Sequence, residues 1–359
     1  MEAKMKANAD SKRDESMTQD TRRLLELARD WMKQGNTTVA FQLLNEALKL
    51  KDTEGDRLIT GEISKEIGRV YMQKGQWDRA EDAYKQATSM FLEQGCLRGA
   101  AESVRNLANM KFQLGQFKDS SSLCEKAIDW ATNSGDFQLR ATILNTQGAI
   151  KSIEGRQKES IKIFRLCLSD FRRSGNKVRQ GYILHNIGLA HLELGEYEES
   201  RAAFDEAMEL AVESQDTNLV ELCYLNKAKL FLRLGDIVAA RSLLKAAQEL
   251  LEILKSPSLA ADLAIIEAGA FRLAGDPNKA AAVLDDALEA ARKHNLLQNE
   301  AELLCESGQI AMDQGHSEVA RARLEAAISL FKKTGSFQIK KAVDKLRNLE
   351  ASVKNAARV

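Results

Sequence analysis

Small and bulky apolar residues recur along the chain at fixed distances from a series of evenly spaced glycines. Successive glycines lie 40 residues apart, and the series is Gly35, Gly75, Gly115, Gly155, Gly195, Gly235, Gly275 and Gly315. Glycine accepts the left-handed backbone conformation that follows many helix ends, so its regular recurrence predicts a helix stop followed by a reversal of the chain. The pattern therefore predicts a repeat protein rather than one globular core.

A second set of turn positions falls halfway between these glycines. It comprises Gly55, Gly95, Gly135, Gly175, Gln215, Lys255, Asn295 and Gly335. Each half-repeat then holds a helix of about 16 residues, or roughly 25 Å at 1.5 Å per residue. Pro257 follows Ser256 and Pro277 follows Asp276, which is the cap-then-proline arrangement of a helix start. The predicted unit is an antiparallel helical hairpin.

Residues at fixed offsets from the glycines indicate how the two helices of a hairpin pack. Seven residues before each glycine stand Ala28, Gly68, Ala108, Gly148, Gly188, Ala228, Ala268 and Gly308. Five after it stand Ala40, Ala80, Ser120, Ser160, Ser200, Ala240, Ala280 and Ala320, and twelve after it Ala47, Ala87, Ala127, Cys167, Ala207, Ala247, Ala287 and Ala327. The ninth position after the glycine is larger, for example Leu44, Tyr84, Phe164 or Phe204. Small residues allow close helix approach, and the larger one fills the space between hairpins.

This set of offsets resembles the signature of the tetratricopeptide repeat family, and the match is close over residues 185–210. The resemblance extends over residues 18–335. It implies an all-α fold, a right-handed α-solenoid of eight antiparallel helical hairpins with a C-terminal capping helix. The ordinary family repeat has 34 residues, so the 40-residue period is similar to the longer variant found in cell-polarity adaptors and some bacterial regulators. The resemblance implies little about the partner, because this fold serves many unrelated ones.

The two ends of the chain differ from the repeats. Residues 1–17 are polar, lack apolar periodicity and are expected to be a disordered tail. In the last segment, residues 336–359, apolar side chains follow helical spacing at Phe337, Ile339, Val343, Leu346 and Leu349. This segment is expected to be a capping helix that covers the last of the eight repeats in residues 18–335.

Composition and charge narrow the function classes. The 52 basic residues equal the 52 acidic ones, so no global field favours nucleic acid or an anionic membrane. No apolar run approaches the roughly 20 residues of a membrane helix. The five cysteines are far apart and are expected to be reduced thiols, which favours a cytoplasmic location, with the nucleus or an organellar matrix as alternatives.

Candidate chemistry is sparse. The four histidines, His185, His191, His294 and His316, stand in no metal or nucleophile motif, and the glycines form no phosphate-binding loop. We therefore expect a protein that is not an enzyme and has no cofactor or metal.

In the tetratricopeptide family the first helix of each hairpin lines the concave face of the solenoid. The resemblance implies that positions thirteen, ten, nine, six and three before the glycine are exposed there. In the middle repeats these positions or their neighbours are rich in basic and amide side chains: Lys65, Arg69, Arg105, Asn106, Asn109, Asn145, His185, Asn186, Asn226, Lys229 and Arg233. Asparagine is a poor helix former, and its amide can both donate to and accept from an extended peptide backbone. We expect these residues to bind a partner, with a merely solvated polar face as the alternative.

The seventh repeat is more apolar, with Ile265, Ile266, Gly269 and Leu273 at or beside the same positions. A ligand that matches both parts would carry acidic and apolar segments, although ordinary hairpin packing also explains the apolar residues. The two functions that remain are an adaptor that binds a protein or extended peptide in the groove, and a structural subunit of a larger assembly that uses its convex face and edges. Neither the partner nor the oligomeric state follows from the sequence.

Overall fold

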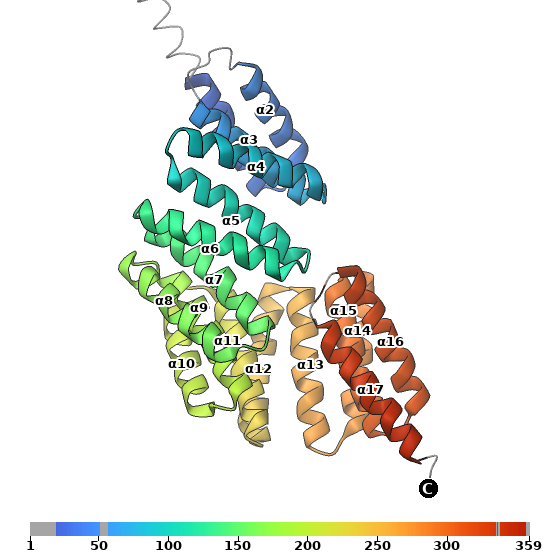
Figure 1. Cartoon of the computed structure of the whole chain (residues 1–359). Coiled ribbons are helices and arrows are strands. Elements are labelled where there is room, and N and C mark those ends of the chain that lie inside the picture. Colours follow the sequence, from blue (N-terminus) through green and yellow to red (C-terminus); the bar gives the residue numbers. More distant parts are fainter. Residues whose placement is uncertain (1–18, 51–56, 335, 337, 357–359) are drawn as a thin grey trace, which may run out of the picture. The chain divides into compact units, whose positions relative to one another are not determined.

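The computed structural model describes residues 19–50, 57–334, 336 and 338–356, and every regular element in these residues is an α-helix (Figure 1). After a first helix over residues 19–33, the helices are α2 (Thr37–Lys49), α3 (Arg57–Gln73), α4 (Trp77–Glu93), α5 (Leu97–Gln113), α6 (Phe117–Asn133), α7 (Phe137–Ile153), α8 (Gln157–Arg173), α9 (Lys177–Leu194), α10 (Tyr197–Glu213), α11 (Thr217–Arg233), α12 (Ile237–Leu254), α13 (Pro257–Leu273), α14 (Pro277–Lys293), α15 (Leu297–Asp313), α16 (Ser317–Thr334) and α17 (Ile339–Ala356). The all-helical solenoid predicted from the sequence is confirmed.

The helices pair as predicted, each odd-numbered helix with the even-numbered one that follows it. We call the first helix of a hairpin the A helix and the second the B helix. The chain divides into two compact units, Met1–Ile150 and Lys151–Val359, and the division falls inside α7. The predicted tail, Gly55, Gly335 and Phe337 lie outside the described residues.

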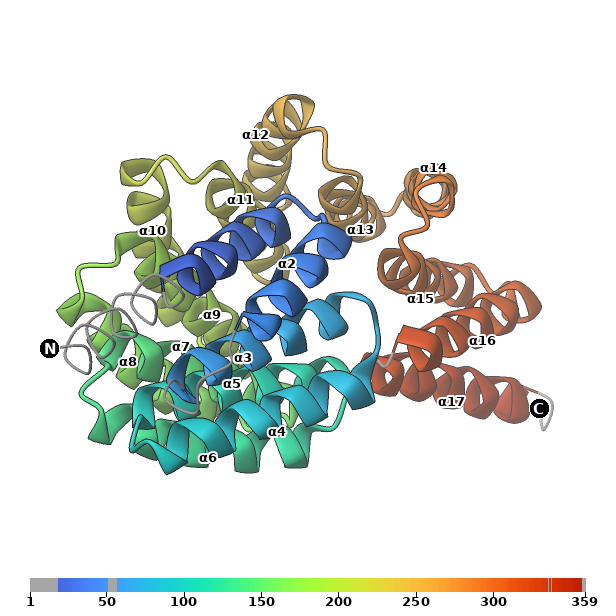
Figure 2. The ribbon, with the colours of Figure 1, turned by 90° about the horizontal axis from the view of Figure 1, so that it is seen from above.

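Within each unit, an A helix packs against its own B helix, the preceding B helix and the neighbouring A helices. In the first unit α3 contacts α5, and in the second unit α9, α11, α13, α15 and α17 form a continuous series of A-helix contacts (Figure 2). Among the helices described, no comparable contact joins successive B helices. The A helices therefore form the inner, more closely spaced layer of each unit.

The predicted turn residues adopt the left-handed conformation. Gly75 has a φ of 69°, and the non-glycine positions Gln215, Lys255 and Asn295 have φ values of 55°, 49° and 54°. The amide of Gly75 donates to the carbonyl of Met72 at 3.1 Å, and the next amide, of Gln76, donates to that of Tyr71 at 2.9 Å. This pair of bonds satisfies carbonyls that a helix end leaves free.

The predicted small positions are buried at the crossing of the two helices. A Cβ on Gly68 would come within 2.7 Å of the Tyr84 ring, so only glycine fits opposite this tyrosine. At the same crossing two hairpins add a hydrogen bond, from Ser120 Oγ to the Ala108 carbonyl at 2.8 Å and from Ser200 Oγ to the Gly188 carbonyl at 2.9 Å. Close packing and satisfied hydroxyls thus hold each hairpin together.

The last helix, α17, packs against α15 and α16. Its Ala342 and Leu349 are buried in one apolar cluster with Leu324 and Phe331. The boundaries predicted for the tail, the repeats and the cap remain predictions.

No helix within the described ranges is long and apolar enough to span a bilayer. All five cysteines are free thiols, and four of them are buried.

Candidate functional site

The inner layer of the second unit contains a cavity of about 630 Å³ that only A helices line. Leu192 and Glu193 of α9, Lys229, Leu232 and Arg233 of α11, Ile265, Ile266, Gly269, Arg272 and Leu273 of α13, Glu306 and Gln309 of α15, and Lys341 and Lys345 of α17 surround it. The volume lies in the range of small-ligand and peptide-side-chain pockets. We call it the inner cavity.

Two of its basic residues belong to α11 and take part in no ion pair with any carboxylate that the structure describes. These are Lys229 and Arg233, one helical turn apart and both solvent-accessible. Burial among the surrounding helices lowers the pKa of Lys229, against the opposing influence of Asp262 and Glu302. A cation that has lost water without gaining a close counter-ion is available for an anionic group of a ligand.

Two other basic residues belong to α17 and share one carboxylate. Lys341 Nζ lies 2.6 Å from Glu306 Oε1, and Lys345 Nζ lies 3.2 Å from Glu306 Oε2. Burial tends to raise the pKa of Glu306, but Lys345 and Lys341 together lower it to about 2. Glu306 thus stays ionised and fixes both ammonium groups at the cavity wall.

A smaller cavity of about 200 Å³ adjoins the first and shares Lys229, Ile265, Glu306 and Lys341 with it. Its own acidic residues are Asp262 and Glu302. Burial and the neighbouring Glu302 raise the pKa of Asp262 to about 6, and burial also raises that of Glu302. Glu302 accepts hydrogen bonds from Gln298 and Gln338 at 2.6 and 2.8 Å. The carboxylates thus face the smaller cavity and the unpaired cations the larger one.

Four of the eleven residues predicted to be exposed on the groove are instead buried, namely Lys65, Asn106, His185 and Asn226. In the first unit Lys65 forms ion pairs with Glu62 at 3.0 Å and with Glu102 on the next A helix. Asn106 accepts a hydrogen bond from the Arg105 guanidinium at 2.8 Å. The expectation of exposure is wrong here because neighbouring A helices lie close enough to pair these groups with one another.

In the second unit His185 and Asn226 are partners of each other. Asn226 Nδ2 lies 2.8 Å from His185 Nε2 and donates to the Leu222 carbonyl at 2.9 Å. Burial lowers the pKa of His185 to about 4, although a hydrogen bond with Asn186 opposes the shift. A neutral imidazole and an amide thus join α9 to α11, so exposure was again wrongly expected.

The other seven predicted residues are at least partly accessible. Arg69 pairs with Glu66 at 2.7 Å, and Asn109 accepts a hydrogen bond from Thr146 at 3.0 Å. Arg105, Asn145 and Asn186 are half-buried, while Lys229 and Arg233 are exposed. The structure brings Lys229 and Arg233 together at the inner cavity, beside the predicted apolar residues of α13.

Sequence reasoning missed the residues of α17. Lys341 and Lys345 stand 40 residues after Ala301 and Cys305, which lie on the preceding A helix. Extending the 40-residue phase beyond Gly315 therefore could have identified this helix as a ninth A helix.

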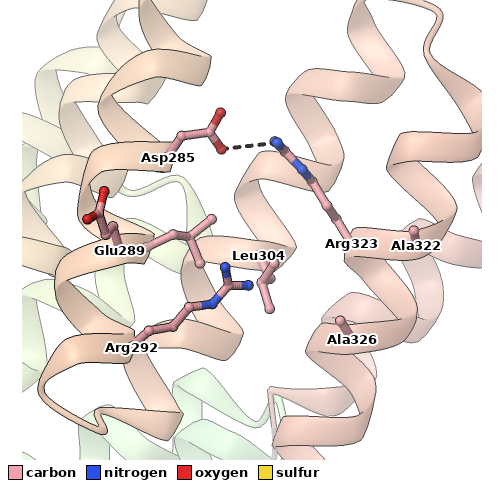
Figure 3. A pocket seen from close by; sticks show the side chains of 8 residues that line it. Asp285, Glu289, Arg292, Leu304, Ala322, Arg323 and Ala326 are labelled. Carbon is pink, nitrogen blue, oxygen red and sulfur yellow. Dashed lines mark hydrogen bonds and ion pairs between the residues drawn. The ribbon is translucent and has the colours of Figure 1, made fainter.

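A second cavity, of about 590 Å³, lies on the outer side of the second unit between α14 and α16 (Figure 3). Arg323 crosses from α16 to Asp285 of α14 at 3.0 Å, and Arg292 pairs with Glu300 at 2.7 Å. Both arginines of this outer cavity already have carboxylate partners. No group of three or more metal-ligating side chains is found among the residues described.

Comparison with known proteins agrees with the repeat pattern. A family model described as tetratricopeptide repeat matches residues 180–253, and one described as soluble NSF attachment protein matches residues 2–142. Comparison with the curated proteins finds no match.

Several solved structures share the fold. The apo form of RapI is 15% identical with a TM-score of 0.63, over 77% of this chain and 99% of its own. A Rap protein in complex with competence and sporulation factor is 14% identical with a TM-score of 0.62, over 88% of this chain and 98% of its own. Aspartyl phosphate phosphatase F from Bacillus subtilis is 18% identical with a TM-score of 0.62, over 80% of this chain and 73% of its own. At these identities the likeness concerns the fold alone, and together with the repeat pattern it identifies the chain as a tetratricopeptide-repeat protein with a 40-residue repeat.

Proposed function

We propose that this protein is a non-catalytic scaffold that binds a peptide or protein on its A-helix surface. The observation that carries the proposal is the inner cavity, where the unpaired Lys229 and Arg233 lie beside Ile265, Ile266 and Leu273. Apolar surface with a few convergent polar groups is the usual composition of a binding pocket. A Rap conjugation gene regulator of similar fold has been solved in complex with the Phr* peptide, which supports the same use of the fold here.

Within this proposal the predicted groove residues have two roles. Arg69, Arg105, Asn109, Asn145, Asn186, Lys229 and Arg233 would contact the partner, since all are at least partly accessible. Lys65, Asn106, His185 and Asn226 would position the surface through their buried contacts between side chains. A cytoplasmic location and the absence of nucleic-acid and membrane partners belong to the same proposal.

Gly269 offers a direct test, because it lines the inner cavity and has room for a side chain. A Cβ added there would meet only Leu232 Cδ1, at 3.7 Å, which is an ordinary van der Waals contact. Gly269→Phe should fill the cavity, and replacing a mid-helix glycine should not lower helix stability. The matched control is Ala282→Phe on the exposed side of α14 in the same hairpin.

The probe is a set of peptides selected from a displayed random library on the full-length protein. We expect Gly269→Phe to weaken these peptides by about tenfold or more, as blocking a central contact does, while Ala282→Phe binds normally. Circular dichroism melting checks that both variants are folded. Unchanged binding to Gly269→Phe would contradict the proposal.

A structural subunit that docks through its B helices is the second candidate, and the outer cavity favours it (Figure 3). Here Ala326→Phe, at the wall of that cavity, should disrupt assembly while Gly269→Phe does not. Size-exclusion chromatography of the assembly purified from its native source separates the two candidates.

A further inference from the structure

The inner cavity has two basic walls that face it from opposite ends of its A-helix series. Lys229 and Arg233 of α11 form the first wall, and Lys341 and Lys345 of α17 form the second. Helix α13 lies between α11 and α15 in this series and contributes an apolar floor of Ile265, Ile266 and Leu273. The cavity therefore combines basic edges with an apolar centre.

The charges at these walls are not balanced from within. Five basic side chains line the cavity against two acidic ones, Glu193 and Glu306, and Asp313 neutralises Arg272 from 3.0 Å away. An excess of two positive charges remains. Asp262 and Glu302 line the smaller adjoining cavity and not this one.

The second wall is held in place before any ligand arrives. Glu306 binds both ammonium groups of α17, at 2.6 and 3.2 Å, so one carboxylate serves two cations. Each ammonium has three donors, and the carboxylate leaves some of them free for a ligand. Preorganised cations lose little conformational entropy when an anion binds.

We propose that the inner cavity recognises an acidic–apolar peptide segment, with its apolar side chain on the α13 floor and its carboxylates at the two basic walls. This inference rests on the proposed function and specifies its ligand class. It also makes α17 part of the binding site, beyond its predicted role as a cap. The partner is then a protein with an exposed segment in which Asp or Glu flanks Leu, Ile or Phe.

Four short synthetic peptides with blocked ends provide the probes for this ligand class. The first carries Asp and Glu around Leu and Phe, the second replaces the acids with Asn and Gln, the third replaces the apolar residues with Ser, and the fourth replaces the acids with Lys. By fluorescence anisotropy on the full-length protein, the first should bind about tenfold tighter than each of the others. Its affinity should fall as salt rises, because salt screens accessible charges.

Two sets of charge-removing variants test the walls, each against a control on α17. Lys229→Met with Arg233→Met leaves no carboxylate without its ion partner. Lys341→Met and Lys345→Met are combined with Glu306→Gln, because Glu306 would otherwise be buried without its cations. Each set should weaken the acidic–apolar peptide by about tenfold and flatten its salt dependence. The control is Lys340→Met with Lys354→Met, which removes two exposed charges outside the cavity.

Equal binding of the acidic and amide peptides, a preference for the basic peptide, or an equal loss in the Lys340/Lys354 control would overturn this inference. The proposed function stands if Gly269→Phe still blocks library-selected peptides that have no acidic preference. It fails separately if Gly269→Phe binds every selected peptide normally.

Discussion

At the residue scale, the two sides of each hairpin crossing compensate in size. Where the small position is glycine the opposite residue is large: Cβ atoms added to Gly188 or Gly308 would lie 2.6 Å from Phe204 or 2.9 Å from Leu324. Where it is alanine, as at Ala228, the opposite position carries a smaller side chain such as Leu244. The combined volume is thus kept at native packing density.

This compensation predicts the effect of Gly188→Ala. The added methyl group would overlap the Phe204 ring, so the free energy of unfolding should fall by about 1–3 kcal/mol despite the better helix propensity of alanine. Adding Phe204→Leu recreates the Ala228 and Leu244 pair and should recover most of the loss. Urea unfolding of the two single variants and the double variant measures the coupling. Purely additive losses would mean that the two positions do not share one space.

Glu221 breaks the repeat pattern at another packing position, fourteen residues before the glycine. The equivalent residues are small in the neighbouring repeats, for example Gly181 and Ala261. Glu221 is nevertheless fully buried, and neither carboxylate oxygen has a hydrogen-bond partner among the residues described. Burial, with a smaller contribution from Asp262, raises its pKa from 4.5 to about 7. Such a group favours the folded state only while it is protonated.

The sign of the resulting pH dependence follows from this raised pKa. The unfolded chain releases the Glu221 proton near pH 4.5 and the folded chain only near pH 7, so stability should decline between these values as pH rises. We expect Glu221→Gln to reduce the loss of stability between pH 5 and pH 8 by about 1–3 kcal/mol. Glu249→Gln, an exposed change on the adjacent α12, is the control. Urea unfolding at the two pH values checks this, and identical losses in wild type and Glu221→Gln would contradict it.

The residue scale also shows where prediction from the sequence stops. The small and bulky offsets predicted the hairpin crossing, because packing volume is a property of residue type and spacing. The same spacing could not separate a groove residue from a buried one at His185 and Asn226, which hydrogen-bond each other at 2.8 Å. Ligand recognition and helix-to-helix hydrogen bonding both require polar groups on the same helix face.

At the element scale, turns were predictable because their backbone conformation restricts the residue type. The left-handed φ at Gly75 and at the other glycines follows from the sequence period. Three turns use Gln215, Lys255 and Asn295 instead, and the period placed these correctly although only asparagine among them favours this conformation. The 40-residue phase was thus stronger information than local propensity.

Gly155 tests how much a turn depends on this conformation. Its φ is 76°, and a Cβ there would meet no atom within 4 Å, so the effect of a substitution is conformational rather than steric crowding. Gly155→Val should lower the free energy of unfolding by about 1–3 kcal/mol, and Gly155→Asn by clearly less, because asparagine tolerates positive φ. Thermal melts followed by circular dichroism compare the two. Equal effects would mean that left-handed strain is not the cause.

At the scale of the whole molecule, stability comes from the interfaces between neighbouring hairpins, so the ends determine whether the last interface is covered. The sequence predicted a helix after the eighth repeat from the apolar spacing at Ile339, Leu346 and Leu349. It did not predict that the polar face of that helix would line the inner cavity. A repeat boundary alone does not show which face of an end helix is reused for binding.

Deleting residues 336–359 therefore should have two separable effects. The apolar cluster around Leu324 and Phe331 would lose its contacts with Ala342 and Leu349, so the melting temperature should fall and aggregation should increase. Glu306 would also lose both lysines, and a buried carboxylate without a cation destabilises the fold further above its raised pKa. Leu349→Asp should reproduce the loss of stability with all cavity charges present, whereas the Lys341→Met, Lys345→Met and Glu306→Gln combination should lose peptide affinity and melt near the wild-type temperature. Differential scanning calorimetry and anisotropy on the same samples separate the two. Wild-type melting and solubility of the deletion would mean that α17 does not cap the repeats, because a solenoid end that needs no cover has no exposed interface to protect.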